Sequence, residues 1–245
     1  MVYSNILSVF SFLTIFPTKT YDLNFVAQNM YLFPLVGLLI GITIAGFSFL
    51  LFPLLPSLVL GFIVTAAILG ITGLHHSDAL SDLADGLMAK GSKEFKHKVM
   101  SDPRNGTAGT VVLIFYIIGM IIFVSNIEDI IKLISAIIIA EIISKYSMVL
   151  QCFIGKSAWP GLNSIFITEM KVKKKFLVST IILTIILILF GFNFYYVLSS
   201  ILIMLANCFV LTFISNRSFG GISGDVIGAT NEISRFLVFF IYSIF

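Results

Sequence analysis

The sequence predicts an all-α fold, a polytopic membrane helix bundle of about seven transmembrane helices in which residues 1–245 form a single integral membrane domain. Composition is the first observation: 58% of the 245 residues are hydrophobic and only 11% are charged, whereas soluble domains carry about 25% charged residues. A chain with so little polar surface needs lipid as its solvent. The other two observations are a series of runs of about 20 apolar residues and a one-sided distribution of Lys and Arg.

The apolar runs account for the chain in order. Residues 1–17 are apolar but too short to span, and we expect them to form a half-helix or an interfacial segment. Seven longer runs follow as candidate spans; a tight hairpin at 53–56 joins the first two, and the last contains Glu232 and Arg235. These spans are residues 31–52, 57–74, 108–125, 130–154, 176–191, 194–214 and 226–245.

The positions of the cations orient this bundle. Twelve of them fall on the side of the 75–106 loop, whereas only Lys132 falls on the opposite side. Such an excess marks the cytoplasmic side of a membrane protein, so we expect a cell-membrane protein with a cytoplasmic N-terminus. The twelve are Lys19, Lys90, Lys93, Lys96, Lys98, Arg104, Lys156, Lys171, Lys173, Lys174, Lys175 and Arg217.

The most informative segment follows the second apolar run. Asp78, Asp82 and Asp85 are spaced i, i+4, i+7, which places three carboxylates on one face of a helix at the membrane boundary. These carboxylates repel one another unless a cation lies between them, and Mg²⁺ takes carboxylate oxygens together with phosphate oxygens. We therefore predict a divalent-metal site that binds a diphosphate; the alternative is a solvated acidic helix start, which the helix dipole favours. His75 and His76 are candidate metal or phosphate contacts, or else structural residues.

A second polar segment is the loop 90–106. Its lysines are expected to attract anionic lipid headgroups. Arg104 lies in a turn beside Asp102 and Gly106, just ahead of a predicted helix start. A planar guanidinium next to exposed backbone N–H groups suits bidentate phosphate binding, so Arg104 is a candidate phosphate contact.

The third polar segment is rich in glycine. Gly221 and Gly224 allow a tight loop whose backbone can approach a ligand closely. Asp225 and Glu232 are seven residues apart and so share a helical face, and Glu232 lies inside the last candidate span. An ionisable residue at that depth is a functional candidate.

Together these motifs resemble a known family, cobalamin-5′-phosphate synthase, also called adenosylcobinamide-GDP ribazoletransferase. The resemblance covers most of the chain in the right order, and the first acidic motif and the last glycine motif are its most specific parts. Lys145, Lys156 and Pro103 depart from the family, which tends to show arginine at the first two positions and serine at the third. The matching segments are 12–17, 33–41, 76–87, 101–109 and 220–232.

The resemblance implies an Mg²⁺-dependent phosphotransferase that works on the cytoplasmic side of the membrane. A ribose hydroxyl of α-ribazole, or of its 5′-phosphate, would attack the phosphate attached to adenosylcobinamide in adenosylcobinamide-GDP, and GMP would leave. The expected partners are these two substrates and membrane lipid. A nucleic acid is not expected, and a homo-oligomer is left open.

The residues then receive predicted roles within this chemistry, which depends mainly on positioning and charge neutralisation. The metal ligands are expected to be Asp78, Asp82 and Asp85, assisted by Asp102. The substrate contacts are expected to be His75, His76, Arg104, Gly221 and Gly224. The catalytic residues are expected to be Asp82 and Asp85, together with Asp225 or Glu232 as the base that receives the hydroxyl proton.

Two other functions are alternatives to this one. A CDP-alcohol phosphotransferase also uses an Asp-x-x-Asp-Gly core, which residues 82–86 match, but its downstream pair of aspartates four apart is missing here. An ion-coupled transporter would use buried charges as a relay, but such proteins often show hydropathy repeats, and the carboxylates here crowd one edge. The relay would be Glu141, Lys145, Glu232 and Arg235, although the first two could simply neutralise each other.

Overall fold

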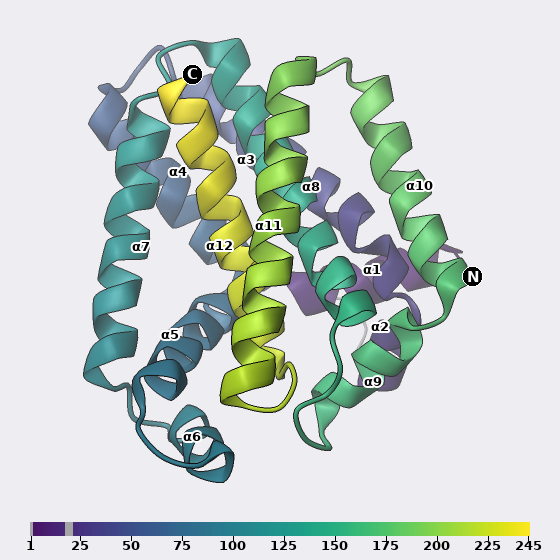
Figure 1. The fold of residues 1–245 in the computed structure, drawn as a ribbon. Helices are drawn as coiled ribbons and strands as arrows, with labels where there is room; N and C mark the ends of the chain where they lie inside the picture. The colour runs from purple at the N-terminus through teal and green to yellow at the C-terminus, as the bar shows by residue number, and fades with distance from the viewer. Residues whose placement is uncertain (1, 18–21) are drawn as a thin grey trace.

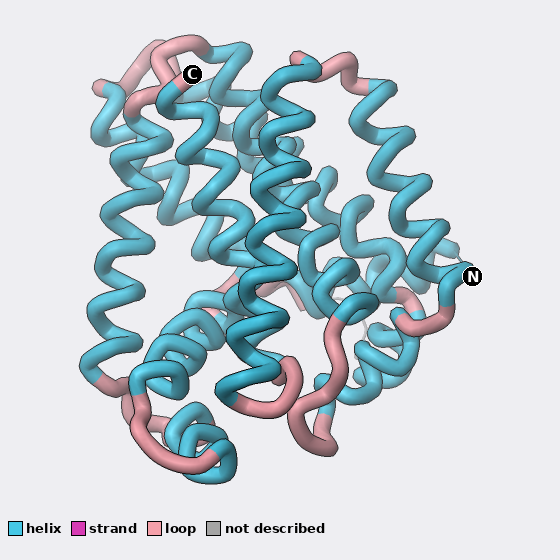
Figure 2. Tube along the Cα trace, viewed as in Figure 1, coloured by secondary structure: helices cyan, strands magenta, loops and turns pink. Residues whose placement is uncertain are grey.

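The computed structural model describes residues 2–17 and 22–245, so Lys19, counted above among the cytoplasmic cations, lies outside the described residues. The described part is helical throughout, apart from loops and a single β-bridge between Ser157 and Ile222. Figure 2 shows that most loops gather at the two ends of the molecule. The elements are α1 (Val2–Leu13), α2 (Leu23–Gln28), η1 (Met30–Leu32), α3 (Phe33–Leu51), α4 (Ser57–Thr72), α5 (His75–Met88), α6 (Lys93–Met100), α7 (Thr107–Ser125), α8 (Ile130–Ile154), α9 (Leu162–Met170), α10 (Lys173–Leu189), α11 (Phe194–Ser218) and α12 (Gly224–Ile244).

Several of these helices have the length and composition of membrane spans. In the described part, η1 with α3, and α7, α8 and α11, are each long and apolar enough to cross a bilayer. Helices α4 and α5 pass the same test only as a pair, and they are bent by 93° at their junction. The predicted all-α, multi-pass membrane helix bundle is therefore confirmed. The count of seven stays a prediction, because α10 has only 17 residues and α12 is polar in its first half.

Helix α8 is the centre of the bundle. Nearly every side chain from Ala136 to Cys152 is buried, and α3, α9, α10, α11 and α12 pack around it. Gly37 and Gly41 let α3 approach closely, since a Cβ at Gly37 would lie 2.5 Å from the Glu141 carbonyl oxygen. Small residues at such crossings are typical of helices that pack in lipid. The outer helices instead expose apolar side chains, as α7 does with Val111, Ile114, Phe115, Ile118 and Ile122.

The two ends of the bundle differ in charge. Helices α5, α6 and α9 and the first turn of α10 lie toward the end opposite the C-terminus (Figure 1). This end carries the lysines of α6 and α10, whereas Lys132 lies in the first turn of α8 at the other end. Because cytoplasmic ends of membrane proteins collect Lys and Arg, the distribution agrees with the predicted orientation. Which end faces the cytoplasm stays a prediction.

Candidate active site

Helix α5 carries the predicted acidic motif and runs obliquely toward the charged end of the bundle (Figure 1). The chain turns out of α4 at Gly73, whose φ of +68° is a conformation that glycine adopts readily. The buried face of α5 packs against α7 and α12. Gly228 makes that packing close, since a Cβ there would lie 2.6 Å from the Ala79 Cβ. The aspartates of α5 are less buried: Asp78 is exposed, and Asp82 and Asp85 are half-buried.

Four carboxylates form an acidic cluster, which we define as Asp78, Asp82, Asp85 and Asp225. The first three lie along α5, and the fourth lies in the first turn of α12. Burial raises the pKa of Asp82 to about 7, with further increases from the charges of Asp78, Asp225 and Asp85. The charges of the other three carboxylates therefore act on Asp82, as the spacing on α5 predicts for two of them.

The acidic cluster fits one way of holding Mg²⁺. Within residues 2–17 and 22–245, no three His, Cys, Asp or Glu side chains lie close enough together to hold an ion by themselves. Mg²⁺ is usually bound by one or two carboxylates and completed by substrate phosphates and water. The donor set present matches that mode, and the ligand roles predicted for Asp78, Asp82 and Asp85 stay predictions.

Asp85 has a structural task in addition. Its carboxylate accepts hydrogen bonds from the backbone N–H groups of Gly106, at 2.7 Å, and Gly109, at 2.9 Å. These donors belong to the start of α7, where N–H groups lack partners within the helix and the helix dipole favours a negative charge. These two hydrogen bonds thus hold the start of α7 against α5. The Gly-x-x-Gly spacing at 106–109 is the sequence signal for this contact, which was not among the predictions.

Asp102 and Arg104 form a pair of their own in the loop before α7. The Arg104 backbone N–H and Nε both donate to Asp102 Oδ1 at 3.0 Å, and Nη2 donates to Oδ2 at 2.9 Å. These hydrogen bonds lower the pKa of Asp102 to about 2. The Arg104 side chain is 87% exposed. The metal role of Asp102 and the phosphate role of Arg104 stay predictions.

Gly221 and Gly224 of the glycine-rich loop have different surroundings. A Cβ at Gly221 would lie 2.5 Å from the Lys156 carbonyl oxygen and 2.6 Å from the Ala158 nitrogen, because this loop pairs with residues 156–158. A Cβ at Gly224 would meet no atom within 4 Å. Gly221 is therefore explained by close packing of two loops, whereas Gly224 leaves open space beside Asp225. The substrate contacts predicted for both glycines stay predictions.

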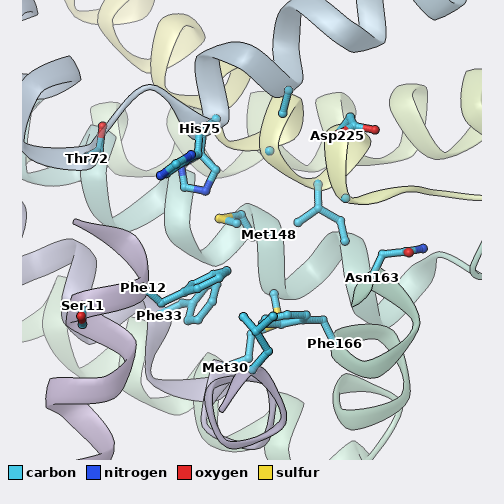
Figure 3. Close-up of a pocket in the computed structure, with 16 residues that line it drawn as sticks. Ser11, Phe12, Met30, Phe33, Thr72, His75, Met148, Asn163, Phe166 and Asp225 are labelled. Carbon is cyan, nitrogen blue, oxygen red and sulfur yellow. The ribbon is translucent and has the colours of Figure 1, made fainter. Parts of the chain in front are cut away.

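A pocket of about 520 Å³ adjoins the acidic cluster, with His75, Gly224 and Asp225 among its lining residues. Figure 3 shows His75 and Asp225 on one side of this pocket and a group of aromatic and Met side chains on the other. The lining comes from eight helices, α1, α2, α3, α4, α5, α8, α9 and α12, together with η1. Four of the predicted site residues, His75, His76, Gly224 and Asp225, thus line the same cavity.

The buried charges of α8 and α12 form a separate network. Arg235 donates from Nε to Glu141 Oε1 at 2.6 Å and from Nη1 to Glu232 Oε2. Lys145 lies 3.2 Å from Glu141 Oε2. These four side chains are at most 1% exposed, and their two positive and two negative charges cancel. Tyr116 of α7 also donates to Glu232.

His76 and Asn231 connect this network to α5. The Asn231 amide donates to Glu232 Oε1 at 2.8 Å and lies 3.5 Å from His76 Nδ1. Asn231 also accepts a hydrogen bond from Lys145 at 3.0 Å. The structure therefore places Glu232 between helices, in contact with protein groups, whereas His76 contacts this network and also lines the pocket. Their substrate and catalytic roles stay predictions.

These features define an all-helical, multi-pass membrane protein with a carboxylate-edged pocket between its helices. The sequence model of the family described as cobalamin-5-phosphate synthase matches residues 5–243, and the chain belongs to this family. The predicted resemblance is thereby confirmed. This family match does not favour a CDP-alcohol phosphotransferase or a transporter.

Three curated relatives are each named adenosylcobinamide-GDP ribazoletransferase. The protein of Methanosarcina barkeri is 32% identical over 231 residues, covering 85% of this chain and 79% of the relative. That of Methanocella arvoryzae is 31% identical, covering 92% and 90%. That of Clostridium tetani is 32% identical, covering 97% and 95%. No solved structure matches the chain.

Proposed function

We propose that this protein is an adenosylcobinamide-GDP ribazoletransferase that works on the cytoplasmic face of the cell membrane. It joins α-ribazole, or α-ribazole 5′-phosphate, to the phosphate of adenosylcobinamide-GDP and releases GMP. The observation that carries the proposal is the acidic cluster beside a pocket. It occurs in a chain that aligns with most of the length of relatives bearing this name. Phosphoryl transfer needs such a site, because positioning and charge neutralisation supply most of the catalysis.

The reaction exchanges one bond to phosphorus for another. A ribose hydroxyl oxygen forms a bond to the phosphorus attached to cobinamide, and the bond from that phosphorus to the bridging oxygen breaks, so that GMP leaves with the electron pair. We assign the hydroxyl proton to the Asp225 carboxylate, because Asp225 lines the pocket. Glu232 is 1% exposed and bound by Arg235 and Tyr116, which leaves it a positioning role.

The proposal includes Mg²⁺ as cofactor. We assign its protein ligands to Asp82 and Asp78, since Asp85 already accepts two backbone hydrogen bonds. When bound, the ion neutralises the diphosphate and the charge that develops on the departing oxygen. With the ion between them, Asp78 and Asp82 would hold the diphosphate end of the substrate beside Asp225, which lines the pocket.

The test is GMP release from adenosylcobinamide-GDP by proteoliposomes that contain the protein, α-ribazole and Mg²⁺. We expect Asp82→Asn to lower GMP release at least about 100-fold, in line with the loss of a metal ligand. Asp129→Asn is the matched control, because Asp129 caps α8 at the other end of the bundle and Asn caps a helix as well as Asp does.

Two results would contradict the proposal. GMP release that is equal in the wild type and in Asp82→Asn would remove the acidic cluster from the reaction. No GMP release by the wild type, together with CMP release from a CDP-alcohol, would favour the CDP-alcohol phosphotransferase instead.

A further inference from the structure

The pocket beside the acidic cluster has two chemically different ends. Away from His75 and Asp225 its wall is made by three aromatic rings, Phe12 of α1, Phe33 of α3 and Phe166 of α9 (Figure 3). The ring centroids of Phe12 and Phe166 are 5.5 Å apart and those of Phe12 and Phe33 are 6.2 Å apart. We call these three side chains the aromatic wall.

Two methionines complete this apolar end. Met30 is fully buried, and Met148 from the central helix α8 is 4% exposed. Thioethers pack well against ring edges, and aromatic rings stack on other planar rings at centroid distances of about 4.5–7 Å. A flat, apolar ring system is therefore the chemical group that this end of the pocket would bind best.

The other end of the pocket is polar and reaches the reaction site. His75 and Gly224 are exposed, and Asp225 belongs both to the pocket lining and to the acidic cluster. A hydroxylated group placed here would lie beside a carboxylate and an imidazole, which can accept and donate hydrogen bonds. The pocket thus suits a molecule with an apolar planar part at one end and hydroxyl groups at the other.

We propose that this pocket is the binding site of the attacking nucleoside, with a fused bicyclic apolar base on the aromatic wall and the ribose hydroxyls at His75 and Asp225. This assignment rests on the proposed function, and it names which of the two substrates the pocket takes. α-Ribazole belongs to this chemical class. In this position the attacking ribose hydroxyl lies beside Asp225, the proposed proton acceptor.

The size of the pocket separates the two substrates. A volume of about 520 Å³ falls in the range that holds one small molecule, about 300–1,000 Å³. A nucleoside fits within it, whereas an adenosylated corrinoid carrying GDP is several times larger. The corrinoid substrate must therefore approach the acidic cluster from outside this pocket and present only its diphosphate.

The pocket also predicts a preference among nucleosides. A purine base carries ring nitrogens and, in adenosine, an amino group, which would lose their water against the rings and methionines of the wall. Burial of such groups without hydrogen-bond partners is unfavourable. We expect a benzimidazole riboside to bind at least about tenfold more tightly than adenosine.

The experiment measures equilibrium binding of labelled α-ribazole to the purified protein in nanodiscs, without the second substrate, alongside KM values from GMP release. Phe166→Leu removes the ring but keeps an apolar side chain of similar size, and Phe166→Ala removes both. We expect Kd for α-ribazole to rise about tenfold in Phe166→Leu and further in Phe166→Ala, while KM for adenosylcobinamide-GDP stays within about twofold. Phe209→Ala, on an exposed face of α11, is the control and should change neither value.

Each contrary outcome has a definite meaning. If Phe166→Leu raised only KM for adenosylcobinamide-GDP, the pocket would bind that substrate instead, and the inference would be overturned. A phospholipid that copurifies with the wild type and is lost in Phe166→Leu, with Kd for α-ribazole unchanged, would make the pocket a lipid site. Binding of α-ribazole without GMP release under any condition would instead contradict the proposed function and leave the pocket assignment standing.

Discussion

The buried charge network makes a strong prediction about stability. Arg235→Met would remove one of the two positive charges that face Glu141 and Glu232, and it would leave a net negative charge between α8 and α12. All three side chains are at most 1% exposed, so water cannot compensate. Breaking a buried ion pair from one side costs about 3–5 kcal/mol. At about 2–4 °C per kcal/mol for a chain of about this length, Tm should fall by about 6–20 °C.

The assay can use the protein's own cysteines. Cys152 and Cys208 are both buried, so a thiol-reactive dye will report unfolding of the detergent-solubilised protein. The compensating variant Glu232→Gln with Arg235→Gln removes one charge of each sign. It should recover at least half of the loss in Tm, because no net charge is then left in the network. A Tm for Arg235→Met within about 2 °C of the wild type, or a double variant no more stable than the single one, would refute this reasoning.

Four further predictions concern the site and the loop beside it. Asp225→Asn should lower kcat by about 10²- to 10⁴-fold, the usual contribution of a general base, and leave Tm unchanged; a fall in Tm with normal kcat would make Asp225 structural. Burial and neighbouring carboxylates raise the pKa of Asp82 to about 7, so Mg²⁺ competes with a proton for this carboxylate below that pH. The Mg²⁺ concentration for half-maximal activity should therefore fall by up to about tenfold per pH unit as the pH rises toward 7. In Asp82→Asn this pH dependence should be lost. The same raised pKa means that the metal-free protein should lose stability as the pH rises through 7, which melting curves without Mg²⁺ will show. Gly221→Ala should destabilise the protein by about 1–3 kcal/mol, because its Cβ meets the Lys156 carbonyl, whereas Gly224→Ala should melt like the wild type; equal Tm values would contradict the packing argument.

Hydropathy predicted the membrane fold because each spanning helix must satisfy its own backbone and face lipid with apolar side chains. The runs at 31–52, 108–125, 130–154 and 194–214 are matched by spanning helices. The 93° bend after the run at 57–74 was not predicted. That bend depends on how α5 packs against α7 and α12, which hydropathy does not describe.

The candidate site was predictable where residues are close in sequence. The spacing of the α5 aspartates predicted their common face, because helical periodicity alone decides it. The contact of Tyr116 with Glu232 and the hydrogen bonds from Gly106 and Gly109 to Asp85 were missed. These contacts join segments more than 20 residues apart, so they depend on the packing of whole helices. The pocket was missed for the same reason, since its lining comes from eight helices.

The most direct test of the account is the binding of Mn²⁺, a spectroscopic substitute for Mg²⁺, to the protein with adenosylcobinamide-GDP present. Electron paramagnetic resonance should show an ion bound to the wild type and to Asp129→Asn, coupled to substrate phosphorus. In Asp82→Asn the affinity should fall by about 10- to 100-fold. Equal Mn²⁺ affinity in all three proteins would contradict the claim that the acidic cluster binds a cation together with a diphosphate.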